Sequence, residues 1–300
     1  MAKKSKKTEI LICDRAGTPL EHKDGTQAKL LRFLYGSAPG RLALKGLTCP
    51  VVSRLTGAAM DHPLSTIAIP FSVKKMQIPL WEYEKVVYRS YNEFFTRMIL
   101  PQYRPVNPDP DILISPCDAK LTVLPIEEDT RFVIKNAEYR LADMIGCERL
   151  AEQFIGGDCL IFRLTPDDYH RYCFPDDCAV GKTKEIPGKL HTVNPIAADY
   201  HVKVYHHNAR TVTMLHTEHF GRLLQIEVGA MLIGRIVNHP HRQMQQVKRG
   251  AEKGYFAFGG STVVVITEPW RVKIDADLRR NSIHGYETIV HFGERIGTTE

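Results

Sequence analysis

The chain lacks the features that mark secreted, membrane-spanning and zinc-ribbon proteins. Its seven cysteines are an odd number and no two of them have CxxC spacing, so neither a disulfide framework nor a zinc ribbon is predicted. No run of eighteen apolar residues occurs, and no apolar signal-peptide core follows the basic residues 1–7. We therefore expect a reduced, cytoplasmic setting in which any contact with a membrane is peripheral.

The composition is that of a globular protein with an uneven charge distribution. Hydrophobic residues make up 43% and charged residues 25% of 300, which excludes a disordered chain. Residues 1–90 carry 15 Lys and Arg against 7 Asp and Glu, a net charge of +8. Residues 91–300 carry 25 against 27, a net charge of −2. This asymmetry favours an anionic partner for the first third, either nucleic acid or a membrane surface.

The sequence divides into three parts. Residues 1–25 form a polar, basic arm that we expect to be loose. Residues 26–100 form a helical region in short, proline-interrupted pieces, whose apolar faces alternate with Lys and Arg. Such helices either lie in a membrane interface or cap a catalytic body, and composition alone favours the cap.

The third part, residues 101–300, is predicted to be a β-rich catalytic domain. Short apolar or alternating runs lie between Gly, Pro and Asp, a pattern typical of an antiparallel sandwich or barrel. One helix is expected at residues 141–154 and another at residues 91–100. The predicted fold class is therefore α+β, with a mostly antiparallel, sandwich- or barrel-like body and an N-terminal helical region.

The histidine pairs of the second half offer a weak metal signal. His216 with His219 and His239 with His241 have ligand-like spacing, but no HExxH helix and no acidic ligand accompany them. Ordinary surface and core histidines explain them more simply, so no metal site is predicted.

Two other segments have chemical potential that pattern alone does not resolve. Residues 167–173 place carboxylates, an imidazole and a thiol after a predicted strand, as an acid–base site or a charged turn would. The Gly-Gly-Ser-Thr step at residues 259–262 opens an apolar strand. It is either a strained turn with a hydroxyl beside a carbonyl or a glycine bulge. It is a poor phosphate loop, because no lysine and no helix follow the glycines.

Together, six short segments make the chain resemble the phosphatidylserine decarboxylases from about residue 26 to residue 300. In order, these segments are residues 91–97, 115–120, 168–171, 193–197, 227–230 and 258–262. The final residues 285–288 and 293–297 are similar to those of the shorter bacterial branch of that family.

The resemblance implies that the chain makes its own cofactor. Cleavage between Gly260 and Ser261 would leave a β chain, residues 1–260, and an α chain, residues 261–300. The α chain would begin with a pyruvoyl group derived from Ser261, which serves as the electron sink in decarboxylation. The implied substrate is phosphatidylserine and the product is phosphatidylethanolamine. The implied setting is the cytoplasmic face of a bacterial membrane, with an anionic lipid surface as partner and a homodimer left open.

The resemblance also assigns roles to individual residues. Asp118 matches the aspartate that assists self-cleavage, and His170 matches the histidine that handles a proton or the carboxylate during decarboxylation. The family commonly has a second histidine three residues after the first, where this chain has Cys173. Three interpretations stay open: Cys173 is the base, His191 replaces it, or processing is slow or absent.

Rival functions of other classes remain at this point. One is a pyruvoyl-dependent decarboxylase of a soluble amino acid, and another is an unprocessed, lipid-binding pseudoenzyme. A nucleic-acid binder is disfavoured, because no zinc finger, RNP motif or recognition helix appears. With the resemblance included, the basic first third is better explained as a membrane-docking region than as a cap.

Overall fold

The computed structural model describes residues 10–20, 26–129, 131–134, 137–200, 202–231, 235–258 and 261–300. Its helical segments are α1 (Thr26–Gly36), α2 (Ala38–Leu47), α3 (Pro50–Asp61), η1 (Pro63–Ala68), α4 (Ile69–Met76), η2 (Leu80–Glu82), α5 (Tyr91–Phe95), η3 (Pro101–Tyr103), α6 (Leu141–Ile145), α7 (Glu148–Ala151), η4 (Glu152–Phe154), η5 (Pro195–Tyr200), α8 (Val204–His207) and α9 (Ala276–Ile283). Its strands are β1 (Leu11–Cys13), β2 (Pro19–Leu20), β3 (Ile112–Ile114), β4 (Ala119–Pro125), β5 (Arg131–Ile134), β6 (Ala137–Arg140), β7 (Asp158–Leu164), β8 (Arg171–Cys173), β9 (Cys178–Ile186), β10 (Arg210–Thr217), β11 (Arg222–Val228), β12 (Ile236–Asn238), β13 (Gln245–Val247), β14 (Glu252–Phe256), β15 (Ser261–Thr267), β16 (Val272–Ile274), β17 (Tyr286–Val290) and β18 (Arg295–Thr299).

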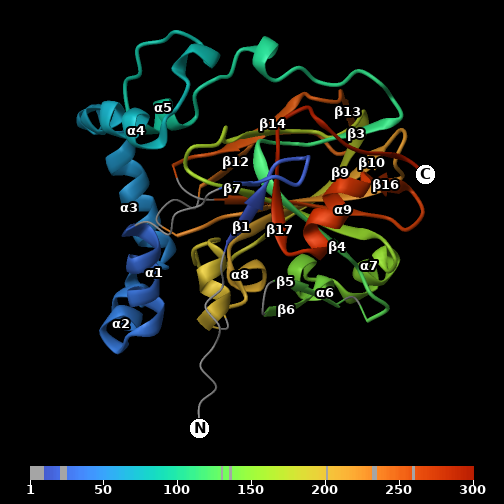
Figure 1. Ribbon diagram of the computed structural model, residues 1–300, viewed down its shortest axis with the longest axis horizontal. Helices are drawn as coiled ribbons and strands as arrows, with labels where there is room; N and C mark the ends of the chain where they lie inside the picture. The colour runs from blue at the N-terminus through green and yellow to red at the C-terminus, as the bar shows by residue number, and fades with distance from the viewer. Residues whose placement is uncertain are drawn as a thin grey trace.

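A ten-stranded sheet dominates the body, in the order β13-β9-β10-β11-β15-β7-β4-β17-β1-β2 (Figure 1). All its pairs are antiparallel except that of β1 with β17. The expected α+β class with a mostly antiparallel body is thus confirmed. The barrel alternative is wrong, because among the described residues β13 and β2 remain as two separate edges. The sheet buries its faces against other layers, so it has no need to close on itself.

Those other layers cover both faces of the large sheet. One face packs on the three-stranded sheets β12-β14-β8 and β16-β18-β3 and on α9. The opposite face packs on α6, α7, α8 and the β5–β6 hairpin. In β15 the side chains alternate, with Val263 and Val265 on the first face and Val264 and Ile266 on the second. Burial on both sides explains why this strand reads as a continuous apolar run.

Two predicted helices are shorter than expected. The helix predicted at residues 141–154 is divided into α6, α7 and η4, because Gly146 takes the left-handed conformation (φ +67°) that ends α6. The helix predicted at residues 91–100 is only α5. It begins at the N-cap Ser90, whose hydroxyl accepts a hydrogen bond from the Glu93 backbone N–H, and it ends before Ile99 forms a β-bridge with Tyr83.

The N-terminal helices line one side of the body (Figure 1). Helix α1 packs through Leu31, Leu34 and Tyr35 against η5 and its neighbours. Residues 10–20 differ from the expected loose arm, because β1 pairs with β17 and buries Ile12 and Cys13. Within the described residues, no helix is both long and apolar enough to cross a bilayer.

Four connecting segments lie at the same end of four neighbouring central strands, β15, β7, β4 and β17; this end of the strands is called the site edge of the sheet. Residues 115–118 join β3 to β4 and residues 291–294 join β17 to β18; here β4 pairs with β17, and β3 pairs with β18. Residues 165–170 join β7 to β8, and the described residues 257–258 follow β14; here β8 pairs with β14, and β7 pairs with β15. Each pair of connections therefore runs side by side. Five of the six family-like segments include or flank this edge.

Candidate active site

Ser261 is the first residue of the central strand β15. It lies opposite Leu164 of β7 and shares a face with Val263, so its side chain points toward the small sheets. Ser261 is 1% exposed, and among the described residues its Oγ has no hydrogen-bond partner. Because buried polar groups are nearly always paired, an orphaned hydroxyl needs an explanation, and a reactive role supplies one. Gly259 and Gly260 lie outside the described residues.

His170 stands on the neighbouring connection. Its backbone oxygen accepts a hydrogen bond from the N–H of Phe256, five residues before Ser261, and its ring lies 4.0 Å from that of Phe95. Burial, with a contribution from the charge of Arg97, lowers the pKa of His170 to about 3, so the ring is neutral near pH 7.

The tautomer of His170 follows from its contacts. Nδ1 lies 2.9 Å from the backbone oxygen of Asp168, which can only accept, so Nδ1 carries the proton. Nε2 therefore carries a lone pair, and it has no partner among the described residues. A neutral imidazole with a free, buried lone pair can accept a proton from a reacting group.

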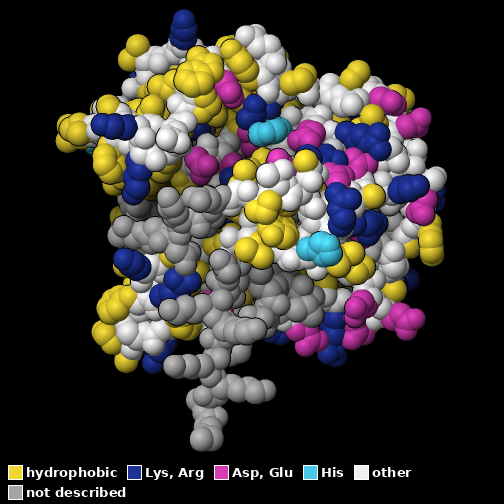
Figure 2. All heavy atoms as spheres, in the orientation of Figure 1, with side chains coloured by type: hydrophobic (Ala, Val, Ile, Leu, Met, Phe, Trp, Pro, Cys, Tyr) yellow, Lys and Arg dark blue, Asp and Glu magenta, His cyan; other side chains and the backbone are white. Residues whose placement is uncertain are grey.

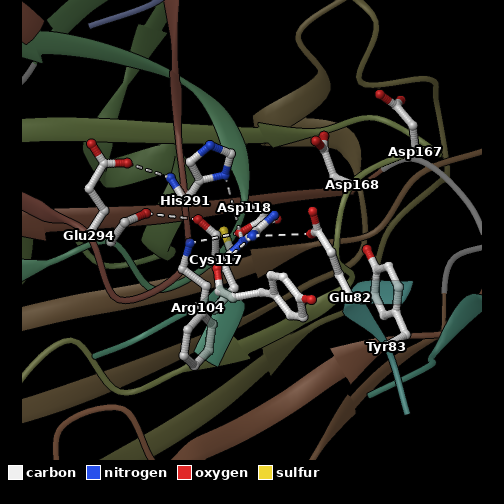
Figure 3. A network of polar contacts seen from close by, with 12 residues as sticks. Glu82, Tyr83, Arg104, Cys117, Asp118, Asp167, Asp168, His291 and Glu294 are labelled. Carbon is white, nitrogen blue, oxygen red and sulfur yellow. Dashed lines mark hydrogen bonds and ion pairs between the residues drawn. The ribbon is translucent and has the colours of Figure 1, made fainter. Parts of the chain in front are cut away.

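Asp118 is held from several directions at the start of β4 (Figure 3). Arg104 binds both carboxylate oxygens, with Nε–Oδ1 at 2.8 Å and Nη2–Oδ2 at 2.7 Å, and the Phe292 N–H donates to Oδ1 at 2.8 Å. His291 Nδ1 lies 3.8 Å from Oδ1, an ion-pair distance rather than a hydrogen bond. Burial alone would raise the pKa of Asp118, but His291 and Arg104 outweigh it and hold that pKa at about 2.

A second carboxylate lies close to this group. Lys120 Nζ donates to both oxygens of Asp168, at 2.7 and 2.8 Å, and to the Thr165 hydroxyl at 2.6 Å. This bridge ties the connection that carries His170 to the strand that follows Asp118. Burial raises the pKa of Asp168 although Lys120 opposes the rise. Residues 165–168 thus form a charged turn held by the contacts of Lys120 with Asp168 and Thr165.

Cys173 lies at the end of β8 in an apolar pocket. It is fully buried with Ile112 and Ile114, and its backbone N–H donates to the oxygen of Pro116. Burial raises the pKa of the Cys173 thiol, so the thiolate needed in a base is disfavoured near pH 7.

His191 lies on the other side of β15. Asn208 donates hydrogen bonds to the backbone oxygens of His191 and Gly229, and Gly229 directly follows the strand residue Val228 that pairs with Thr262. The ring itself contacts Tyr35 and His207. Burial and the adjacent His207 lower the pKa of His191 to about 4. The structure thus gathers Asp118 and His170 at the site edge and sets His191 against α1.

Sequence reasoning missed three residues of this site. Arg104 lies in the proline-rich segment before β3, Lys120 within a family-like segment, and His291 just after β17. No local pattern joins residue 118 to residue 291, so their contact emerges only from the pairing of β4 with β17. Within the described ranges, no group of three or more His, Cys, Asp or Glu side chains is arranged to hold a metal ion.

These groups define the class of protein first. A buried unpaired hydroxyl, a neutral imidazole with a free nitrogen and an ionised carboxylate at one sheet edge are the components of an acid–base enzyme site. The family model for phosphatidylserine decarboxylase matches residues 91–298.

Curated relatives give the same result over nearly the whole chain. Phosphatidylserine decarboxylase proenzyme 2 of Clostridium acetobutylicum is 42% identical over 90% of this chain and 91% of its own length. The phosphatidylserine decarboxylase proenzymes of Chlamydia caviae (37% identity; 90% and 91% covered) and Clostridium botulinum (35%; 96% and 99%) are also similar. The chain belongs to the phosphatidylserine decarboxylase family.

The contact between Asp118 and His291 predicts a measurable titration. Asp118 raises the pKa of His291, although burial and Arg104 oppose the rise and Glu294 adds to it. In the Asp118→Asn variant we expect the pKa of His291 to fall toward its ordinary value of about 6.5. NMR titration of the His291 ring protons measures this. Glu294→Gln is the matched control, with a smaller downward shift, and an equal shift in both variants would contradict the assignment.

The contact between Asp118 and His291 also determines how the stability of the fold changes with pH. Because the pKa of His291 is raised on folding, its stabilising effect is complete below the unfolded value and is lost as pH rises through the folded one. The Asp118→Asn protein should show a weaker loss of stability across that interval in urea unfolding.

Proposed function

We propose that this protein decarboxylates phosphatidylserine to phosphatidylethanolamine with a pyruvoyl group made from its own Ser261. Family membership supports the substrate class. The observation that carries the proposal is the Oγ of Ser261, which is buried without a partner among the described residues at the start of the central strand. His170, whose Nε2 is also unpartnered among the described residues, lies on the connection that follows the neighbouring strand β7.

In the proposed self-cleavage, the Ser261 hydroxyl is the nucleophile. Ser261 Oγ loses its proton to a base and attacks the carbonyl carbon of Gly260, and the peptide nitrogen leaves to give an ester. β-Elimination then breaks the Cβ–Oγ bond of residue 261, releasing a carboxylate at Gly260. Water then hydrolyses the resulting dehydroalanine, and its nitrogen leaves as ammonia. The product is a pyruvoyl group at the head of residues 261–300.

The surroundings of Ser261 fit such a group. From Ser261 to Ile266, β15 is paired with β7, and from Thr262 to Thr267 with β11, so the new chain stays in the sheet after cleavage. The ketone supplies the electron sink for the bond that breaks when carbon dioxide leaves. His170 Nε2 is the chain's own group for moving a proton there. Its neutral ring does not repel the substrate ammonium group.

Replacing Ser261 tests this proposal. The wild-type protein should separate into residues 1–260 and 261–300 on a denaturing gel, with a pyruvoyl mass at the head of the shorter chain. Ser261→Ala should remain one chain of 34.1 kDa and make no phosphatidylethanolamine. Lipid chromatography of labelled phosphatidylserine measures the product. An intact wild-type chain would support a pseudoenzyme, and cleavage with turnover only of free amino acids would support the soluble-substrate alternative.

The base of self-cleavage is a separate question. Burial raises the pKa of the Cys173 thiol, which argues against that residue as the base. Two interpretations from the sequence remain: His191 is the base, or processing is slow or absent. We expect Cys173→Ala to cleave at about the wild-type rate, measured by intact mass over time. Loss of cleavage in Cys173→Ala would restore the thiol as base, whereas loss only in His191→Ala would assign the role to His191.

We further propose that residues 26–100 dock the catalytic body, residues 101–300, on an anionic membrane at the cytoplasmic face of the cell. Twelve of the eighteen exposed large hydrophobic side chains of the described residues lie between residues 30 and 87. Residues 26–90 also contain nine Lys and Arg against three Asp and Glu. Figure 2 shows hydrophobic and basic side chains interleaved along the side that α1–α4 occupy. Apolar side chains with flanking cations suit an anionic interface.

Two exposed residues of η1 test the docking. Leu64 and Ile67 are 70% and 78% exposed, and burying each in lipid is worth about 1.5–3 kcal/mol. The double variant Leu64→Ser/Ile67→Ser should bind phosphatidylserine-containing vesicles at least about tenfold more weakly in sedimentation. Ile283→Ser, at an 82% exposed site on α9, is the matched control and should bind normally. Binding should also weaken with salt; equal binding by both variants would contradict the docking surface.

A further inference from the structure

A cavity of about 320 Å³ opens between α3 and the catalytic body. Helix α3 contributes Ser53, Arg54 and Asp61 to its lining, and α5 contributes Asn92. The facing wall includes Leu190, Ala209, Arg235 and Ala257. It is therefore bounded by the proposed docking helices on one side and by the body on the other.

Two walls of this cavity come from segments next to β15 in the chain or in the sheet. Ala257 lies four residues before Ser261, and the Asn92 side-chain oxygen accepts a hydrogen bond from the backbone N–H of Phe258. On the other wall, the backbone oxygen of Ala209 accepts a hydrogen bond from Gly229, which directly follows the β11 residue paired with Thr262. The cavity lining is thus joined by hydrogen bonds to segments that flank the start of β15.

The polar groups of the cavity call for a ligand. Ser53 is 7% exposed, and its Oγ has no partner among the described residues. Arg54 and Arg235 bring two positive charges, which Asp61 offsets only in part. Asp61 accepts a 2.8 Å hydrogen bond from Asn92 and lies 3.8 Å from Arg235. A buried hydroxyl and two arginines on the lining of one cavity suit a phosphate ester.

The volume and position of the cavity limit the kinds of ligand that it can hold. Pockets for small molecules have volumes of about 300–1,000 Å³, so this cavity has room for a polar headgroup but not for two acyl chains as well. Val51 and Leu55, on the same helix as Arg54, are exposed and apolar, and they offer those chains a route outside the cavity.

We infer that this cavity is the headgroup site for phosphatidylserine, with the phosphate held by Arg54, Arg235 and Ser53. The serine end points inward along Ala257 toward residue 261. This inference rests on the proposed function for its choice of lipid, and it assigns the binding of the phosphate to residues outside the reacting centre.

The test measures binding apart from catalysis. The full-length Ser261→Ala chain is titrated calorimetrically with dihexanoyl phosphatidylserine, kept monomeric so that no bilayer is present. Arg54→Gln and Arg235→Gln should each bind about tenfold more weakly, which corresponds to 1.4 kcal/mol for one charge-assisted contact. Ser53→Ala should bind severalfold more weakly without loss of thermal stability, because it removes an unpaired hydroxyl. Arg149→Gln, an exposed arginine on α7, should bind as its parent does.

Processed enzyme provides the second readout with the same soluble lipid. Arg54→Gln should cleave fully, keep kcat and raise KM about tenfold. Binding that is absent from the parent chain, or unaltered in both arginine variants, overturns the inference. So does a defect confined to vesicles, which would make Arg54 a docking residue only. If the wild type fails to produce phosphatidylethanolamine while binding still depends on Arg54, the proposed function fails and the headgroup site stands.

Discussion

The register of the antiparallel pairs β15–β7 and β4–β17 is the constraint on which the site depends. It sets Ser261 opposite Leu164 and Val290 opposite Ala119. The strand ends next to the candidate site residues therefore lie at the same end of the sheet. A slip of one residue would turn Ser261 to the other face, away from His170. Burial on both faces makes such a slip costly, because every apolar side chain of β15 would change layers with it.

The same register explains how β15 would stay in the sheet after cleavage of the chain before Ser261. Strand β15 holds its place through hydrogen bonds to two neighbours and through apolar contacts on both faces, none of which needs the peptide bond before Ser261. The end of the strand at Ser261 is different, because its hydroxyl is buried without a partner among the described residues, and so is Nε2 of His170 on a neighbouring connection. Unpaired polar groups typically cost about 1–3 kcal/mol each. The well-packed remainder of the strand offsets that cost.

The sequence predicted features that depend on local pattern and missed those that depend on distant pairing. The apolar run from Thr262 to Thr267 identified the central strand, and family resemblance led to Asp118 and His170. The open sheet was missed, since a pattern of short strands does not reveal how many other layers cover them. His291 was missed because 173 residues separate it from Asp118. Gly146 could have been read as a helix end, since glycine readily takes the left-handed conformation.

Cys173 shows how far the role of one residue depends on its neighbours. In the family pattern, Asp118 would orient a second histidine at that position. Here Arg104, His291 and the Phe292 N–H bind the carboxylate instead, while Cys173 lies among aliphatic side chains. With a pKa of about 2, Asp118 is ionised near pH 7 and is a poor proton acceptor. Its carboxylate joins two connections through Arg104 and the Phe292 N–H. We therefore expect the proton of Ser261 to pass to another group in the proposed self-cleavage.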